Sequence, residues 1–527
     1  MMNTHVPSQS PIVEIASGKL RGNTTPIGST FKGIPYGGST AGMNRFLAPT
    51  PAPTWSGIRE ARDVGLRCPQ NDGIIKPANA WIRDVQETGE DCLSLNVWTP
   101  SLDEAAKRPV MVWLHGGGYA RGSGGAPGLD GGNLAQVGNV VVVVTLNHRL
   151  NTFGYTYFGD THERFADAGN AGMLDIVQAL EWVRDNIARF GGDAGNVTIF
   201  GQSGGGSKVA VMMTMPRAKG LFHKAIIQSS SSHLRLATPE RAARSTHQLL
   251  KALGLDGQGP ESVQSAPADV LLKAYNTAVK ARNGNDSFRP VVDGRSILHH
   301  PFDLSAPDLA ADIPLMIGSC ETEKSFYDIT VDPDQLALSD DELLGQIAPF
   351  VGLNPDRAAT LIAAYRAARP ERNSRDIYNL ITSDHMYRRN NVEAAERKVK
   401  QGGAPTFLYE FTWKTPVLGG MLRTPHTLCI PFAFGNIKIA KDFVGEGPEQ
   451  QSLMAQVMGA WIAFAKTGNP NHASIAEWPA FNLEMRPTMT FDTTTRVEHN
   501  PRPGELAWIN ACPRFVSDAQ WVEPEAA

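Results

Sequence analysis

Two apolar runs constrain the fold of this chain more than any other feature. Residues 109–114 and 140–146 are almost entirely apolar, which is typical of parallel strands covered on both faces. Between 173 and 190 apolar residues recur at steps of three and four, which predicts an amphipathic helix that ends at Gly191-Gly192. Further strands are expected at 196–200, 225–228, 313–317 and 406–411. This alternation predicts an α/β fold around one mainly parallel sheet.

The pattern changes to helical between about 329 and 400, and we found no repeat or low-complexity linker. We therefore expect residues 1–527 to form one large α/β domain with 329–400 as a helical cap insertion. The chain has 49 Lys and Arg against 53 Asp and Glu, with 42% hydrophobic and 19% charged residues. This balance argues against a disordered chain, a nucleic-acid binder and a polybasic membrane-surface protein.

Neither a membrane span nor a leader is expected from the sequence. No apolar stretch approaches the ~18 residues of a transmembrane helix. Residues 1–7 lack a basic region followed by an apolar run, so no signal peptide is expected. The sequence as it stands predicts a cytoplasmic protein; a periplasmic or secreted one is the alternative if a leader preceded it.

The sequence contains one G-x-S-x-G motif, Gly201-Gln202-Ser203-Gly204-Gly205. It lies between an expected strand ending at Phe200 and a helix-compatible segment at 207–213. Glycines in this position permit a sharp turn that lifts a serine hydroxyl above the sheet edge as a nucleophile. A phosphate-binding loop is the competing interpretation, but Ser207-Lys208 stand in the reverse of the order it requires.

A second glycine run, Gly116, Gly117 and Gly118, directly follows the expected strand 109–114. Backbone N–H groups without side chains can approach a developing oxyanion, and each donor is typically worth about 3–4 kcal/mol of barrier. The N–H of Gly204, just after the serine, would be a further donor.

A serine nucleophile of this type needs an acid and then a histidine later in the chain. The expected strand 313–317 leads to Glu321 and Glu323, and spacing does not choose between them. His426 follows the strand 406–411 on a turn near the same edge and is the favoured base. His385, in the helical insertion, and His472, in a polar turn, are expected at the surface.

Further motifs complete a pattern seen over nearly the whole length. They include Phe31-Lys32-Gly33-Ile34-Pro35-Tyr36, Glu90-Asp91-Cys92-Leu93-Ser94-Leu95-Asn96-Val97, Asn147-His148-Arg149-Leu150, Gly169-Asn170-Ala171-Gly172 and Phe190-Gly191-Gly192-Asp193. With these motifs the chain resembles the type-B carboxylesterases, the family of bacterial esterases and cholinesterases. The resemblance implies an α/β-hydrolase fold and a serine carboxylesterase that acts through an acyl-enzyme on small-molecule esters. No metal or cofactor is implied.

The resemblance also assigns roles to residues. It implies Ser203 as nucleophile, His426 as base and Glu323 as the orienting acid, because the family's acid stands five residues after the glycine matched by Gly318. Gly117, Gly118 and Gly204 match the family's oxyanion hole. Cys68 and Cys92 match a pair that is disulfide-bonded in secreted relatives, and two reduced thiols are the alternative.

This chain departs from the family pattern near the site. Gln202 and Gly204 replace the usual Glu and Ala, Lys208 replaces a Ser, and Cys429 stands where an acidic residue often follows the histidine. Thr322-Glu323-Lys324 replaces Asp-Glu-Gly. Because acidic groups are lost and cations gained, we hypothesise that the pocket accepts anionic or polar esters better than cationic ones. An amide or carbamate hydrolase with the same machinery, and a non-catalytic binding module on the same fold, are the alternative functions.

Overall fold

The computed structural model describes residues 10–26, 28–159, 162–280, 288–332 and 335–514. The segment 1–7, in which no leader was expected, lies outside these residues.

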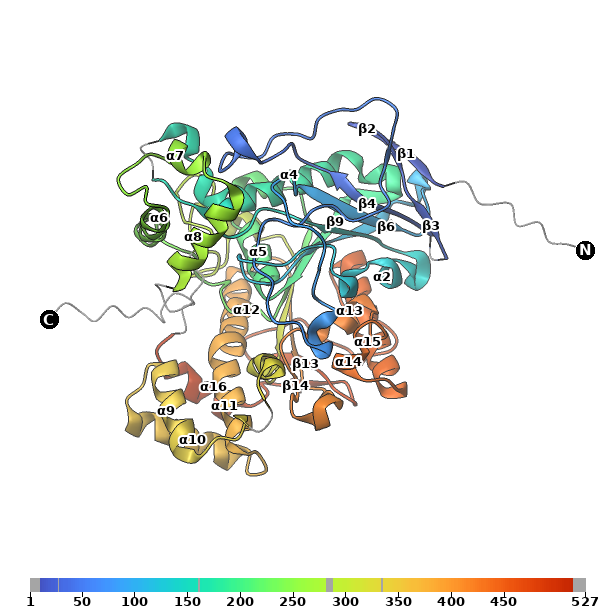
Figure 1. Cartoon of the computed structure of the whole chain (residues 1–527). Coiled ribbons are helices and arrows are strands. Elements are labelled where there is room, and N and C mark those ends of the chain that lie inside the picture. The colour runs from blue at the N-terminus through green and yellow to red at the C-terminus, as the bar shows by residue number, and fades with distance from the viewer. Residues whose placement is uncertain (1–9, 27, 160–161, 281–287, 333–334, 515–527) are drawn as a thin grey trace, which may run out of the picture.

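A mixed sheet of eleven strands forms the centre of the molecule (Figure 1). Its order is β14 (Arg496–His499), β13 (Pro487–Phe491), β12 (Thr406–Phe411), β11 (Leu315–Cys320), β10 (Lys224–Gln228), β9 (Gly192–Gln202), β7 (Arg108–Leu114), β8 (Val142–Leu146), β6 (Ser94–Thr99), β4 (Gly28–Pro35) and β3 (Asn23–Thr25). The strands from β13 to β8 are parallel, and the outer strands β14, β6, β4 and β3 pair antiparallel with their neighbours. The predicted parallel core is therefore present, extended by antiparallel edges.

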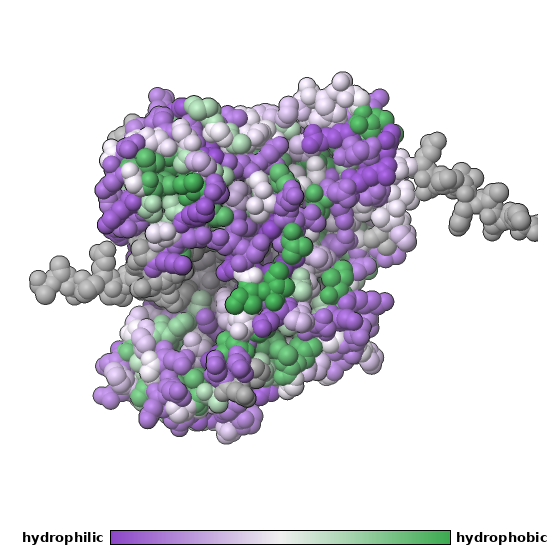
Figure 2. All heavy atoms as spheres, in the orientation of Figure 1, coloured by the Kyte–Doolittle hydropathy of each residue, from purple (hydrophilic) through white to green (hydrophobic). Residues whose placement is uncertain are grey.

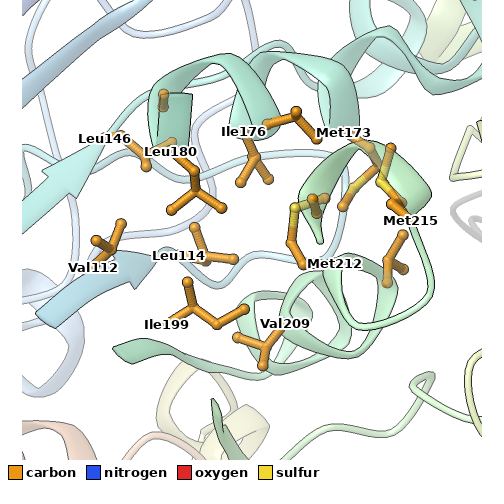
Figure 3. Packing of buried hydrophobic residues seen from close by; sticks show 14 of the residues in the cluster. Val112, Leu114, Leu146, Met173, Ile176, Leu180, Ile199, Val209, Met212 and Met215 are labelled. Carbon is orange, nitrogen blue, oxygen red and sulfur yellow. The ribbon is translucent and has the colours of Figure 1, made fainter. Parts of the chain in front are cut away.

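Successive residues of the central strands face opposite sides of the sheet, as the pleat requires. Val110, Val112 and Leu114 of β7 join the apolar cluster on one face. That face is covered by α4 (Ala171–Asn186) and α5 (Gly204–Met212), whose side chains pack against the strands in Figure 3. Met111 and Trp113 face the other way, toward α13 (Cys429–Phe434) and α15 (Pro448–Thr467). Burial on both faces explains why the run at 109–114 is apolar without alternation.

A helical lobe with its own apolar core lies beside the sheet, at the lower left of Figure 1. It consists of α9 (Asp340–Val351), α10 (Pro355–Ala368), α11 (Ser374–Ser383) and the C-terminal α16 (Pro503–Asn510). A π-helical turn, Asp384–Arg388, joins α11 to α12 (Arg389–Gln401). In contrast to α9–α11, α12 packs directly on β11 and β12. The predicted helical segment 329–400 thus divides into a lobe and a sheet-covering helix.

The remaining elements are shorter or lie at the periphery. The sheet of β1 (Ile12–Ile15), β2 (Gly18–Arg21) and β5 (Ile58–Glu60) covers part of the molecule near the N-terminus. The other helices are α1 (Pro77–Ala80), α2 (Gly132–Gln136), α3 (Asn151–Tyr155), α6 (Pro239–Leu253), α7 (Pro260–Gln264), α8 (Ala268–Lys280) and α14 (Lys441–Val444). Among the described residues no helix is long and apolar enough to cross a membrane. On the face drawn in Figure 2, hydrophobic residues form separate patches among hydrophilic ones.

Residues 12–20 form a tight antiparallel hairpin in which Ile15 pairs with Gly18. One local prediction needs correction. The helix expected over 173–190 ends as an α-helix at Asn186 and continues as one 3₁₀ turn to Phe190, where Gly191 takes a left-handed φ of 76°. The helix is also buried on most sides rather than along one stripe, since its residues join both the sheet and the N-terminal strands in one core.

Candidate active site

Ser203 lies at the sharp turn between β9 and α5. Its φ of 59° and ψ of −126° are unusual for a non-glycine residue, and such strain is held only where the surroundings fix the backbone. Its N–H donates to the carbonyl of Gln228 at the end of β10 (2.8 Å), and its own carbonyl accepts from Ser207 N (3.1 Å). The side chain is partly exposed at the end of the parallel strands, the geometry that the G-x-S-x-G motif predicts.

The glycines around Ser203 are required by close backbone contacts. A Cβ added at Gly205 would lie 2.0 Å from the carbonyl oxygen of Leu114, and one at Gly201 would lie 2.7 Å from the same oxygen. A Cβ at Gly204 would lie 2.3 Å from Gly118 O. The serine turn and the loop after β7 therefore touch through their main chains.

The glycine loop after β7 curves over this turn. Gly117 and Gly118 have φ angles of 91° and 63°, a region that glycine enters without cost. Neither N–H donates to another described residue, and the N–H of Gly204 lies in the first turn of α5, where no carbonyl of the helix is available to accept it. The three predicted oxyanion donors thus come from two loops in direct contact.

Glu323 and His426 are brought together by the segments that follow β11 and β12. Glu323 begins the 3₁₀ helix Glu323–Thr330, and its Oε2 contacts His426 Nδ1. The other carboxylate oxygen accepts from Cys320 N (2.7 Å), and His426 N donates to the Glu323 carbonyl (3.1 Å). Both side chains are buried. A carboxylate held at both oxygens fixes the ring orientation and leaves His426 Nε2 for the reaction.

These contacts distinguish between Glu321 and Glu323, the two candidates for the acid that sequence spacing could not separate. Glu321 points away from His426 toward Arg369 and Arg372, each at 3.7 Å. Burial raises its pKa, opposed by Arg502 and the other arginines.

The surface placement expected for His385 is wrong. Its side chain is buried in the π-helical turn, and its Nε2 contacts the carbonyl of Pro513 at 2.8 Å. His472 is half-buried, with Nε2 3.0 Å from Gln456 O. Neither histidine lines the cavity that holds Ser203.

The imidazole of His426 is enclosed by neighbours from several elements. The ring of Tyr387, in the π-helical turn, lies 5.1 Å away between centroids, and that of Phe326 lies 6.2 Å away. The amide nitrogen of Gln202 lies 3.1 Å from Nε2 and 3.2 Å from Nδ1. A neutral amide therefore occupies the position beside the base where the family usually has a carboxylate.

The two lysines behind our charge hypothesis do not face the cavity that holds Ser203. Lys208 is fully buried and donates from Nζ to the carbonyl of His115 (2.9 Å), under the glycine loop. Burial, reinforced by the charge of Lys208, holds the pKa of His115 and of the stacked His148 well below the usual value. Lys324 lies over the ring of Tyr327, 4.6 Å from its centroid. Neither lysine lines the cavity.

A cavity of about 420 Å³ opens above Ser203. Its wall includes the glycine loop, Gln202 and His426, with Ile74, Ile82, Leu129 and Phe326 as apolar surface. Two arginines, Arg83 and Arg121, also line it, and the sequence reasoning missed both. Residue 83 lies in an irregular segment with no motif, whereas Arg121 follows the glycine loop so closely that its position could have indicated it.

All five cysteines are buried free thiols in the structure, and Cys68 and Cys92 are not bonded to each other. The pKa of Cys92 is raised, first by its hydrogen bond with Cys68 and then by burial. Among the residues described, no group of three or more His, Cys, Asp or Glu side chains could hold a metal ion.

Comparison with known proteins places these observations in a family. A sequence model of the carboxylesterase family matches residues 9–509. The chain belongs to the carboxylesterase family. It is accordingly a serine carboxylesterase, a carboxylic ester hydrolase with the α/β-hydrolase fold.

Several relatives resemble this carboxylesterase over most of their length. The para-nitrobenzyl esterase of Bacillus subtilis is 35% identical over 93% of this chain and 96% of its own. The phenmedipham hydrolase of Pseudarthrobacter oxydans is 31% identical over 90% and 93%. Among solved structures, a Geobacillus stearothermophilus carboxylesterase superposes with a TM-score of 0.81 at 37% identity, covering 94% of this chain and 99% of that one.

Proposed function

We propose that Ser203, His426 and Glu323 are the catalytic triad of this carboxylesterase and that Gly117, Gly118 and Gly204 supply its oxyanion hole. The contact between Glu323 and His426, beside the cavity that contains Ser203, carries this proposal. Ser203 makes no hydrogen bond from its hydroxyl to described residues. Hydrogen bonds between nucleophile and base often tighten only when substrate binds.

The proposed reaction follows from these positions. His426 Nε2 takes the Ser203 proton as Oγ attacks the ester carbonyl, and the three N–H groups hold the resulting oxyanion. Glu323 stabilises the imidazolium and stays ionised. His426 then gives the proton to the departing alcohol, which leaves an acyl group on Ser203. Water, activated by the same imidazole, releases the acid and restores the serine.

We also propose that the described segments act as one α/β domain in which 329–400 is a cap. Support comes from the π-helical turn within that segment, because its Tyr387 packs on the ring of His426. The small-molecule ester would enter through the cavity that contains Ser203.

The direct test is hydrolysis of 4-nitrophenyl butyrate by the wild type and by Ser203→Ala. We expect kcat to fall by about 10⁴- to 10⁶-fold in the variant, as when a triad nucleophile is removed elsewhere. Ser452→Ala, an exposed serine on α15, is the matched control and should retain full activity. Comparable rates for wild type and Ser203→Ala would refute the proposal, and faster hydrolysis of 4-nitrobutyranilide than of the ester would favour an amide hydrolase.

A further inference from the structure

The charges that face the catalytic cavity are of one sign. Arg83 and Arg121 line it, and no Asp or Glu occurs among the described residues of its wall. The rest of the wall is backbone, uncharged polar groups and apolar side chains, apart from His115 and His426. The potential inside such a low-dielectric cleft therefore favours a negative group.

The two guanidinium groups converge on one place. A Cβ added at Gly73 would lie 2.7 Å from one terminal nitrogen of Arg121 and 3.5 Å from one of Arg83. Burial lowers the pKa of Arg83, the charge of Arg121 lowers it further, and Asp72 opposes both. Two like charges directed at one point repel each other, and an anion between them would relieve that repulsion.

The acids nearby already have other partners. Asp72 pairs with Arg67 (2.7 Å), and Asp84 accepts from Ser123 Oγ and from Gln86 N. Neither Arg83 nor Arg121 forms an ion pair with a described residue, and the Nε of Arg83 is buried without a hydrogen-bond partner. A guanidinium group carries five N–H donors in one plane, an arrangement that can bind both oxygens of a carboxylate.

Arg121 is also tied to the reacting centre. Its N–H donates to the carbonyl of Gly117 (3.2 Å), and its Cγ lies 3.0 Å from where a Cβ of Gly117 would stand. The guanidinium therefore extends from the edge of the oxyanion loop, and an anion held there would lie in the same cavity as the scissile carbonyl.

We propose that Arg83 and Arg121 form an anion subsite that selects esters carrying a carboxylate, such as monoesters of dicarboxylic acids. The inference rests on the proposed function, because it concerns the substrate of the same cavity. It keeps the preference for anionic esters suggested by the sequence and assigns it to two arginines instead of Lys208 and Lys324. Bidentate pairing with the carboxylate would orient the ester while the rest of the chain lies on the apolar wall.

The test compares esters matched in size. On the acyl side the pair is mono(4-nitrophenyl) adipate and 4-nitrophenyl hexanoate, and on the alcohol side 4-carboxyphenyl butyrate and phenyl butyrate, with spontaneous hydrolysis subtracted. We expect the wild-type kcat/KM to favour the anionic ester in at least one pair. In that pair Arg83→Gln should lower the anionic-to-neutral ratio about tenfold, mainly through KM, as expected for a lost charged hydrogen bond.

Further variants separate binding from folding. Arg121→Gln should lower the ratio less, because this side chain is exposed, and Arg83→Lys should restore part of it. Arg184→Gln, which removes a surface arginine paired with Asp185, is the control and should keep the wild-type ratio. A merely structural role for Arg83 would lower both rates equally and leave the ratio unchanged, which would overturn the proposal.

The remaining outcomes are also decisive. A wild-type preference for the neutral ester in both pairs, or an unchanged ratio in the double Arg→Gln variant, would overturn the anion subsite while Ser203-dependent hydrolysis of neutral esters preserved the proposed function. Loss of all ester hydrolysis in the wild type would overturn both.

Discussion

Gly205→Ala places a methyl group where the main chain of the oxyanion loop already lies. The new Cβ would be 2.0 Å from Leu114 O, whereas an ordinary contact needs at least 3.4 Å. Backbone must therefore move by about 1.4 Å, the difference between these two distances. Leu114 directly precedes His115 and the glycine loop, so the donors move with it.

This displacement sets the expected size of the effect. A shift of about 1 Å in catalytic geometry typically costs about 100-fold in rate, and forced overpacking costs about 1–3 kcal/mol of stability. We therefore expect Gly205→Ala to lower kcat/KM for 4-nitrophenyl butyrate by at least about 100-fold, with a lower Tm. Gly345→Ala is the control: Gly345 is exposed in α9 with nothing within 4 Å of its added Cβ, and the substitution should stabilise by up to about 1 kcal/mol. Wild-type rate and Tm in Gly205→Ala would refute the packing argument.

Three other predictions concern the acid, the response to pH and the thiols. Glu323→Gln should lower kcat by about 10⁴-fold because the ring loses its orienting charge, whereas Glu321→Gln should retain kcat in the folded enzyme; equal losses would contradict the assignment. Burial lowers the pKa of His385 from 6.5 to about 4, so the neutral ring contributes stability above pH 6.5 that is lost as the pH falls toward 4. At about 1.4 kcal/mol per pH unit this amounts to about 3.5 kcal/mol at most. Urea titrations at pH 7 and 5 should show a smaller loss of stability in His385→Gln than in the wild type, and the same loss in both would count against the prediction. Thiol titration of denatured, unreduced protein should find all five cysteines free, as in the structure, and a count of three would indicate the Cys68–Cys92 disulfide instead.

The apolar runs predicted the parallel centre of the sheet well because burial on both faces leaves a pattern that needs no knowledge of distant contacts. The strand at 406–411 matches β12 residue for residue, and the turn after Phe200 is the one that the glycines require. Boundaries were less predictable where tertiary packing decides them, as at the end of the helix expected over 173–190, which changes to a 3₁₀ turn after Asn186.

The residues of the candidate site also fall into those that local sequence predicts and those that tertiary packing decides. Local sequence predicts Ser203 and the glycine loop, because the main chains of the two turns lie so close together that only glycine fits there. Glu321 and Glu323 follow the same strand, and only the 3₁₀ turn beginning at Glu323 determines which carboxylate meets His426. His385 was expected at the surface because it lies in the helical insertion, whereas inside the protein its Nε2 contacts a backbone carbonyl.

The cationic cavity wall depends on tertiary structure more than on local sequence. Arg83 lies far from any motif, and Arg121 follows the glycine loop without being part of it. Their shared charge becomes visible only when the segments around Gly73 and Gly117 are folded together. Lys208 shows the converse: it stands within the motif-bearing segment, yet its ammonium group is buried against the His115 carbonyl and does not line the cavity.

The central claim is that the acyl group of the substrate passes through Ser203. Acid-quenching the enzyme during turnover of 4-nitrophenyl butyrate, followed by peptide mass spectrometry, tests it directly. The account predicts a butyryl group on the peptide that contains Ser203 in the wild type and none on that peptide in Ser203→Ala. A butyryl group found on a different residue, with Ser203 unmodified throughout turnover, would contradict it.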